Sequence, residues 1–354
     1  MNKSWISALT VMILAVTTAC IYPPGLRSKT NLEIDVEEIK GEGELDRERW
    51  HYIEMEETVC ANGSTAGMGL NFGESRREVV VYLNGGGACW DASSCNLFRT
   101  AANLDITYGP GRMGEELYPL VKSGLLDRDS EVNPWPQASF AYIPYCTGDL
   151  HSGRATTSYD SFGGDKPIHH RGAENLEHFL KRLTKVFPEA EKIWLVGISA
   201  GGYGITWNFP LFREAFGEAE IHVFSDASPW LPVGDHLWAE WKRNWQMDMP
   251  RGCVMCDVAP DHLLRYLLEA YPESRFGISV FERDSTLAAF MRVMPVEIEK
   301  NIEWFLEERF YGDNTSAFVA QGNEHEALLF LDSGLTSKDG QLLSEFLKRW
   351  ADGY

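Results

Sequence analysis

The sequence predicts an α/β fold, with a mainly parallel sheet that is covered by helices on both faces. Strand-like apolar runs alternate with helical patterns along most of the chain, and such alternation is typical of β-α-β units. At 354 residues and 44% apolar content, the chain can bury one large core. The strand-like runs lie near 79–83, 139–145, 192–198, 220–225, 276–281 and 316–320, and the helical patterns near 173–186, 201–216, 297–310 and 340–351.

A serine motif ends the apolar run at 192–198. Its sequence is Gly197-Ile198-Ser199-Ala200-Gly201, and a helical pattern follows. A serine between two glycines at a strand-to-helix junction is typical of the nucleophile elbow of an α/β-hydrolase-like fold, where small neighbours permit a strained turn. The backbone N–H of Ala200 would then face the oxyanion that develops during acyl transfer. The alternative is a glycine-rich turn with a bystander serine.

A glycine loop, Asn84-Gly85-Gly86-Gly87-Ala88-Cys89-Trp90, follows the run at 79–83. Hydrolases with an elbow serine take a second oxyanion donor from such a loop, and consecutive glycines can aim successive N–H groups at one point. We therefore expect Gly86 and Gly87 to be oxyanion donors. A phosphate-binding loop is disfavoured because neither Gly-Lys-Ser/Thr nor G-x-G-x-x-G is present there. An ordinary glycine turn is the remaining alternative.

A general base is expected late in the chain, because the order in this architecture is serine, acid, histidine. His325 lies in a loop directly after the run at 316–320, between Glu324 and Glu326. Nearby carboxylates favour the imidazolium form of such a histidine. We expect His325 to be the base, with a polar loop residue as the alternative. His262 lies in an amphipathic helical pattern and is expected to be a surface or packing residue.

The acid of the triad is expected just past a buried strand, where it can orient the histidine. Asp284 follows the run at 276–281 and is our choice. Asp226, after the run at 220–225, is the main rival, and Glu282 is another. Each of these carboxylates could instead be a solvated strand-end charge or a helix N-cap.

Together these segments resemble the pectin acetylesterase/Notum family of serine carboxylesterases, over about residues 52–325. The resemblance implies an acyl-transfer enzyme with Ser199, Asp284 and His325 as nucleophile, acid and base. It also places the oxyanion donors at Gly86, Gly87 and Ala200. The matching motifs are Cys60-Ala61-Asn62-Gly63-Ser64, Leu83-Asn84-Gly85-Gly86-Gly87-Ala88-Cys89, Tyr145-Cys146-Thr147-Gly148-Asp149, Arg171-Gly172, Gly197-Ile198-Ser199-Ala200-Gly201-Gly202, Ser225-Asp226-Ala227 and Arg283-Asp284-Ser285.

Two positions depart from the family pattern. The family usually has a tryptophan where this chain has Ala88. In this chain the next aromatic residue is Trp90. It also often has a cysteine where this chain has Ile198. Neither change touches the reacting groups, but the first would reshape an acyl pocket.

Residues 228–274 interrupt the alternation of strands and helices. Trp238, Trp241 and Trp245 recur there at helical spacing. The segment could be a lid over the site, or its aromatic helix face could simply pack on the core.

The N-terminus resembles a targeting segment. A lysine precedes the apolar run from Trp5 to Ala19, which is short for a membrane span and ends in Thr-Thr-Ala-Cys20. Small residues before a cysteine resemble a bacterial lipoprotein signal. We expect residues 1–19 to be a signal peptide, Cys20 to be lipidated and residues 20–45 to be a tether. Simple cleavage after Ala19 and an uncleaved anchor are the alternatives.

Six cysteines remain beyond Cys20, and an even number in an exported chain predicts disulfides. Short separations in sequence favour two of the possible disulfide pairs, and the two cysteines that remain would form the third. A zinc site at the C-x-x-C is disfavoured because no second pair completes four ligands, and the setting of a redox dithiol is missing. We expect no metal. The favoured pairs are Cys89–Cys95 and Cys253–Cys256, which would leave Cys60–Cys146.

The formal net charge of −20 disfavours nucleic acid and other polyanions as partners. It also argues against simple transfer of a pectin substrate, because de-esterified pectin is itself anionic.

The sequence as a whole predicts an exported serine carboxylesterase, either a membrane-anchored lipoprotein or a periplasmic or extracellular protein. Residues 46–354 would form the catalytic domain and hydrolyse O-acyl esters, foremost O-acetyl groups on a polysaccharide, without a cofactor. Its partners would be an acylated carbohydrate or another ester, and a membrane through the lipid anchor. One alternative is a lipid or longer-acyl esterase. Another is a non-catalytic surface binding protein on the same fold.

Overall fold

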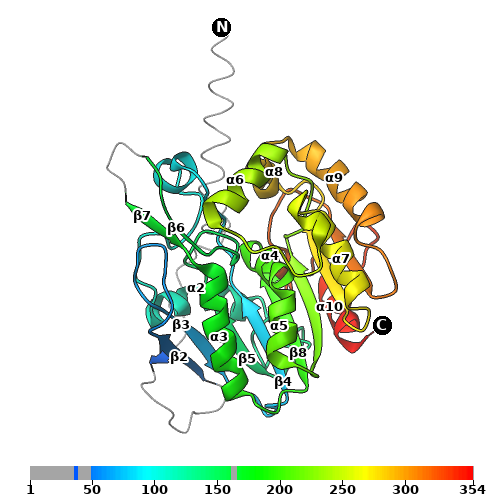
Figure 1. The fold of residues 1–354 in the computed structure, drawn as a ribbon. Coiled ribbons are helices and arrows are strands. Elements are labelled where there is room, and N and C mark those ends of the chain that lie inside the picture. The colour runs from blue at the N-terminus through cyan, green and yellow to red at the C-terminus, as the bar shows by residue number, and fades with distance from the viewer. Residues whose placement is uncertain (1–35, 39–48, 161–165, 354) are drawn as a thin grey trace.

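A nine-stranded sheet forms the centre of the computed structural model, which describes residues 36–38, 49–160 and 166–353 (Figure 1). The strand order is β1-β2-β3-β5-β4-β8-β9-β10-β11. Only β3 runs antiparallel to its two neighbours, so the predicted mainly parallel sheet is confirmed. The strands are β1 (Val36–Glu38), β2 (Trp50–Met55), β3 (Ala66–Asn71), β4 (Glu78–Leu83), β5 (Ser139–Ile143), β8 (Lys192–Ile198), β9 (Glu220–Asp226), β10 (Phe276–Phe281) and β11 (Thr315–Ala320).

Two apolar clusters lie on opposite faces of this sheet, because the side chains of each strand alternate between them. In β4, Val79 and Val81 belong to the first cluster, whereas Val80 and Tyr82 belong to the second. Helices α3, α4, α5, α7 and α9 contribute to the first cluster, and α2 and α10 to the second. In Figure 1, α3 and α5 lie in front of the sheet.

The longer helices and the short helical turns are distributed along the whole described chain. The helices are α2 (Pro110–Lys122), α3 (Gly172–Val186), α4 (Ala200–Trp207), α5 (Phe209–Phe216), α6 (Asp235–Trp245), α7 (His262–Ala270), α8 (Ser285–Met291), α9 (Pro295–Glu308) and α10 (Leu343–Asp352). Short turns are η1 (Ser93–Leu97), η2 (Val254–Asp257) and η3 (Ala327–Phe330), and a separate hairpin pairs β6 (Ala155–Ser158) with β7 (Pro167–His170).

The helical pattern near residues 201–216 forms two consecutive helices. Helix α4 ends at Trp207 and α5 begins at Phe209. Pro210 lacks an N–H and is therefore tolerated only in the first turn of a helix. For this reason a new helix begins next to Pro210. The Asn208 side chain closes the end of α4 by donating to the carbonyl of Gly204 at 2.9 Å.

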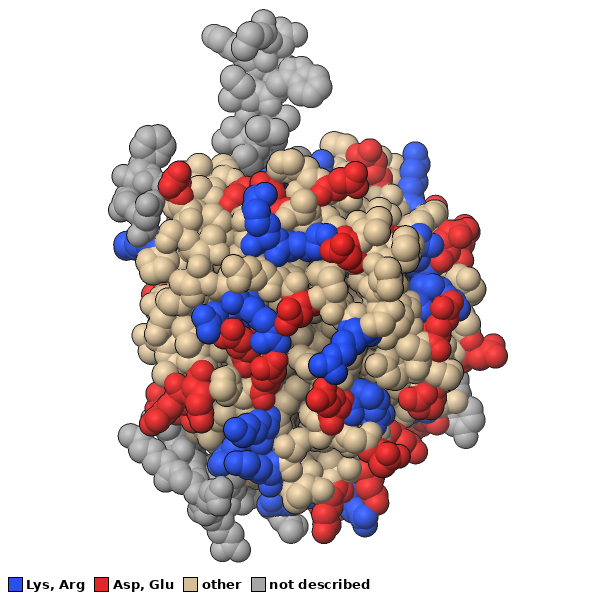
Figure 2. All heavy atoms as spheres, in the orientation of Figure 1, with Lys and Arg blue, Asp and Glu red and all other residues tan. Residues whose placement is uncertain are grey.

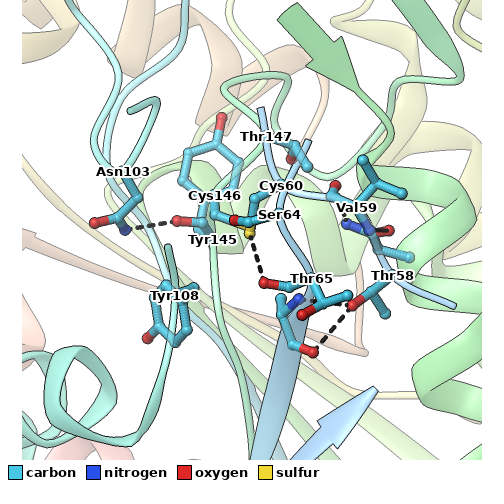
Figure 3. The surroundings of a disulfide bond; sticks show 12 residues. Thr58, Val59, Cys60, Ser64, Thr65, Asn103, Tyr108, Tyr145, Cys146 and Thr147 are labelled. Atoms are coloured by element: carbon cyan, nitrogen blue, oxygen red, sulfur yellow. Dashed lines mark hydrogen bonds between the residues drawn. A yellow bond between two sulfur atoms is a disulfide. The ribbon is translucent and has the colours of Figure 1, made fainter. Parts of the chain in front are cut away.

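All six cysteines beyond Cys20 are paired, as the sequence favoured. Because Cys253 and Cys256 are bonded to each other, their thiols are not free to bind zinc. The Cys60–Cys146 bond joins the segment after β2 to the segment after β5 (Figure 3). Disulfides of this kind are typical of proteins exported to an oxidising compartment. The three bonds are Cys60–Cys146, Cys89–Cys95 and Cys253–Cys256.

Helix α6 is the part of segment 228–274 that lies against the glycine loop. Trp238, Trp241 and Trp245 are buried in the first apolar cluster. The indole N–H of Trp245 donates to the carbonyl of Cys89 at 2.8 Å. The aromatic face of α6 is therefore packed on the core, and movement of this segment as a lid stays a prediction.

The predicted signal peptide, Cys20 and most of the predicted tether lie outside the described residues. Within the part of the chain that the structure describes, no helix combines the length and apolarity needed to cross a membrane. On the face shown in Figure 2, acidic side chains are interspersed with basic ones.

Candidate active site

The carboxyl ends of five neighbouring parallel strands bring the candidate residues to one edge of the sheet. The glycine loop follows β4 and Ser199 follows β8. Asp226 ends β9, Asp284 lies three residues past β10, and His325 lies in the loop after β11. Since these strands are adjacent in the order β4-β8-β9-β10-β11, their following loops meet at the same edge.

Ser199 occupies a strained turn between β8 and α4. Its φ of 53° and ψ of −121° lie where side chains other than glycine are rare. The flanking glycines are required by close approach: a Cβ on Gly201 would lie 1.9 Å from the carbonyl oxygen of Leu83. A Cβ on Gly197 would lie 2.5 Å from the backbone of Gly201. The turn is further held by the Ser199 N–H, which donates to the Asp226 carbonyl at 2.8 Å.

A chain of two hydrogen bonds connects Ser199, His325 and Asp284. His325 Nε2 lies 2.7 Å from Ser199 Oγ, and His325 Nδ1 lies 2.6 Å from Asp284 Oδ2. With Nδ1 donating to the carboxylate, Nε2 is the acceptor for the serine proton. The Asp284 side chain is fully buried and that of His325 is 10% exposed, so water is largely excluded from both bonds. This arrangement can generate a serine nucleophile.

The charge on His325 is set by burial and by the acids around it. Burial lowers the pKa of His325, but Asp284, Glu326 and Asp226 together raise that pKa to about 9. The largest stabilising contribution comes from the hydrogen-bonded Asp284 carboxylate, which favours the imidazolium.

The two rival acids have other partners. Asp226 is fully buried, and its carboxylate accepts from Ser279 Oγ at 2.7 Å, from the Ala327 N–H at 3.2 Å and from the Leu328 N–H at 2.9 Å. It therefore holds the start of η3, directly after His325, rather than the imidazole itself. Glu282 forms an ion pair with Lys338 at 2.7 Å.

The glycine loop lies directly beside the nucleophile. A Cβ on Gly85 would lie 3.1 Å from the Cβ of Ser199. Gly86 and Gly87 have φ values of 145° and 75°, which L side chains rarely adopt, so the loop conformation depends on glycine. Ala200 is the first residue of α4, where backbone N–H groups have no acceptor within the helix. The arrangement can therefore offer backbone donors on two sides of an ester carbonyl.

The remaining candidates lie elsewhere in the fold. His262 begins α7 and is half-buried, as the sequence suggested. Within the described chain, one group with metal-ligand spacing is formed by Cys89, Cys95 and the buried His170. Both of its sulfur atoms are already joined in a disulfide, so the group does not fit a metal ion.

Sequence reasoning missed the supporting role of Asp226. Asp226 was considered only as the acid, and its position at a strand end gave no sign that it binds the backbone of a loop 101 residues later. The effect of Glu326 on the imidazolium of His325 was expected from its position, but its burial, which raises the pKa of Glu326 itself, was not.

Comparison with known proteins places the chain in a family context. A family model described as pectinacetylesterase matches residues 48–246. The palmitoleoyl-protein carboxylesterase notum1 of Xenopus laevis is 29% identical over 49% of this chain and 34% of its own length. The palmitoleoyl-protein carboxylesterase NOTUM of Drosophila melanogaster is 27% identical over 63% of this chain and 35% of its own. The match to these curated relatives thus spans about a third of their length.

A solved structure supports the same fold. The Wnt deacylase Notum from Drosophila superimposes with a TM-score of 0.60 over 84% of this chain and 90% of that chain, at 21% identity. The α/β-hydrolase-like fold expected from the sequence is therefore confirmed.

Proposed function

The chain belongs to the pectinacetylesterase family, and from this membership and the geometry at Ser199 we propose that it is a serine carboxylesterase. The observation that carries the proposal is the hydrogen-bonded chain from Asp284 through His325 to Ser199. A binding protein on the same fold would have no use for a buried, correctly ordered triad, which argues against the non-catalytic alternative.

The proposed reaction is a two-step acyl transfer. Ser199 Oγ attacks the ester carbonyl while His325 Nε2 takes its proton, and Asp284 balances the imidazolium. The alcohol leaves with that proton, and a water molecule, activated by His325, then hydrolyses the acyl-serine. No cofactor takes part in these steps.

Backbone N–H groups of Gly86, Gly87 and Ala200 would stabilise the tetrahedral oxyanion. Two observations support these roles: the glycine loop lies against Ser199, and Ala200 begins a helix. One such donor is worth about 100- to 1,000-fold in kcat.

The relatives change which acyl group we expect the substrate to carry. An O-acetyl ester of a polysaccharide was expected first, and the family description retains that possibility. The curated relatives are instead named palmitoleoyl-protein carboxylesterases, which favours the longer-acyl alternative. We therefore place a lipid-like acyl ester, on a protein or a carbohydrate, ahead of acetyl.

An acyl-chain series tests both levels of the proposal. Purified protein is assayed with nitrophenyl esters from acetyl to palmitoyl, with Ser199→Ala as the control. We expect hydrolysis that increases beyond acetyl and is abolished in the folded Ser199→Ala variant. A maximum at acetyl would favour the acetylesterase alternative. Full turnover by Ser199→Ala, or no hydrolysis of any ester by the wild type, would overturn the proposal.

Export and anchoring form a separate part of the proposal. The three disulfides support an oxidising location. Lipidation at Cys20 rests on the sequence motif. Intact-mass analysis of membrane and soluble fractions should find a mature chain that starts at Cys20 and carries added acyl mass. A soluble chain that starts at Cys20 without that mass would exclude the lipid anchor.

A further inference from the structure

A buried carboxylate on α2 contacts both flanks of the glycine loop. Glu116 Oε2 accepts from the Asn84 side-chain amide at 3.0 Å, and Oε1 accepts from the Asn103 amide at 2.8 Å. The hydroxyls of Tyr108 and Tyr142 donate to Oε2 at 2.5 and 2.9 Å. The Glu116 side chain is only 9% exposed, so these bonds are shielded from water.

The first flank is Asn84, which directly precedes the three glycines. Its backbone N–H donates to the Ile143 carbonyl at 2.9 Å, and its carbonyl accepts from His151 Nε2 at 2.9 Å. Its side chain is the group that reaches Glu116. Three hydrogen bonds thus fix Asn84. Because Asn84 is held in place, the backbone conformation of the following residues, Gly85 and Gly86, is restricted.

The second flank is the segment 100–103, which lies along the outer side of the loop. The Ala102 N–H donates to the Gly86 carbonyl at 2.7 Å, and Gly87 pairs with Ala101 in an isolated bridge. Asn103 anchors this segment: its amide donates both to Glu116 and to the Tyr145 carbonyl, the latter at 2.7 Å (Figure 3).

These contacts determine the direction of one backbone donor. The carbonyl of Gly86 and the N–H of Gly87 belong to the same planar trans peptide, so they point in opposite directions. When Ala102 binds that carbonyl, the Gly87 N–H is directed away from segment 100–103.

We propose that Glu116 is a positioning residue of the oxyanion hole, because it holds Asn84 and Asn103 and thereby aims the Gly87 N–H at the reacting carbonyl. The inference rests on the proposed esterase function and adds to it a residue 83 positions from the nucleophile in sequence. A carboxylate suits this role because it only accepts hydrogen bonds, and all the groups described around it donate.

The test is Glu116→Gln, which keeps the size but replaces one acceptor with a donor. That donor would face Asn84 or Asn103, and one flank of the loop would lose one of its hydrogen bonds while keeping the others. We expect kcat to fall about 10- to 100-fold, part of the value of one oxyanion donor, with KM changed less than about threefold. The control is Glu115→Gln on the same helix, which removes the same charge from a side chain that is 65% exposed; because Glu115 pairs with Arg112 at 2.9 Å, and Arg112 pairs with Glu116 at 3.1 Å, it tests whether a change at Arg112 alone affects catalysis. Its kcat should equal that of the wild type.

Inhibition by a trifluoromethyl ketone separates positioning from a purely structural role. This probe forms a tetrahedral adduct on the serine, so its Ki should rise in Glu116→Gln by about the factor that kcat/KM falls. Active sites are counted by the endpoint of fluorophosphonate labelling, and rates are expressed per labelled site. A lower Tm with unchanged kcat per site would overturn the inference.

Asn84→Ala serves as a second variant if Glu116→Gln does not fold. It removes one anchor and keeps the carboxylate, and it should show the same loss in kcat. Wild-type kcat in folded Asn84→Ala would overturn the inference. Failure of the wild type to hydrolyse esters or to react with fluorophosphonate would instead overturn the proposed function, so the two failures are distinguishable.

Discussion

The two carboxylate oxygens of Asp284 have separate partners, and only one of them is His325. Oδ2 accepts from His325 Nδ1 at 2.6 Å. Oδ1 accepts from the backbone N–H groups of Thr286 and Leu287 at 2.9 and 2.8 Å and so caps α8. The N-cap alternative and the triad assignment therefore describe the same side chain. The cap fixes the carboxylate while leaving its second oxygen for the imidazole.

Replacing Asp284 should affect catalysis far more than replacing Asp226. In Asp284→Asn the side-chain amide can stabilise the wrong tautomer of His325 and cannot balance its charge, so kcat should fall by about 10,000-fold. In Asp226→Asn the imidazole keeps its partner and one oxygen still accepts from the η3 backbone. We expect a loss below about tenfold and a lower Tm. Steady-state kinetics measures the loss of activity, and circular dichroism measures the Tm. An inactive but folded Asp226→Asn variant would mean that Asp226, and not Asp284, is the acid of the triad.

Hydrolysis should increase toward alkaline pH. The base must be neutral, and the pKa of His325 is raised to about 9, with Asp284, Glu326 and Asp226 as the charged groups responsible. The rate constant kcat/KM should therefore rise about tenfold per pH unit and level off above about pH 9. Glu326→Gln removes one of these charges and should move the rise to lower pH. Glu324→Gln, on the other side of His325, is the matched control, and identical profiles for both variants would contradict the assignment.

Stability should change with pH in the opposite direction. A histidine whose pKa rises from 6.5 to about 9 on folding adds stability that is fully present below pH 6.5. This stability is lost as the pH increases through about 9. The Tm of the wild type should decline over this interval, and the decline should be smaller in His325→Ala. Equal declines in the two proteins, measured by calorimetry, would argue against a protonated His325.

The Cys89–Cys95 disulfide should matter for activity, whereas Cys253–Cys256 should matter for stability alone. Cys89 follows Gly87 by two residues, and its N–H donates to the Gly148 carbonyl at 2.9 Å. Replacing both members of this pair with serine should loosen the glycine loop and lower kcat/KM per folded molecule several-fold. The same replacement of Cys253 and Cys256 should lower Tm and leave kcat/KM unchanged. Kinetics normalised to labelled active sites compares the two, and equal effects would contradict the prediction.

Close backbone approach makes Gly201 the least replaceable residue of the serine turn. Gly201→Ala should prevent the native turn, because the added Cβ would meet the Leu83 carbonyl oxygen at 1.9 Å. We expect an insoluble protein or a Tm lower by more than about 10 °C. Gly111→Ala in α2 is the control, since nothing lies within 4 Å of its Cβ. That variant should be as stable as the wild type or slightly more stable.

Six of the parallel strands, β4, β5, β8, β9, β10 and β11, were predictable because each is a short apolar run, whereas β1 and β2 were not predicted. The antiparallel β3 was not, because its sequence contains Gly67 and Gly69 and has low strand propensity. Tertiary contacts require glycine there: a Cβ on Gly67 would lie 2.3 Å from the Ile53 carbonyl oxygen. Helix α2 was missed for a similar reason, since it contains Pro119 and two glycines, and packing overrides their propensity.

The proximity of Ser199, Asp284 and His325 was predictable because each follows a strand in a fixed chain order. The residues that support it were not. Glu115 and Glu116 are identical in type and adjacent in sequence, yet one is exposed and the other accepts four partly buried side-chain hydrogen bonds. Only the path of segment 100–103 and of β4 past α2 distinguishes them, and that path is a property of the whole fold.

The proposed base His325 follows β11, which is the outermost strand at its end of the sheet and the last of the described strands to be synthesised. Its partner Ser199 precedes it by 126 residues. A nascent chain on the ribosome thus carries its nucleophile long before it has a base. Recovery of hydrolysis during refolding would accordingly report the docking of β11 against β10. The proposed esterase activity therefore requires β11 to be in place.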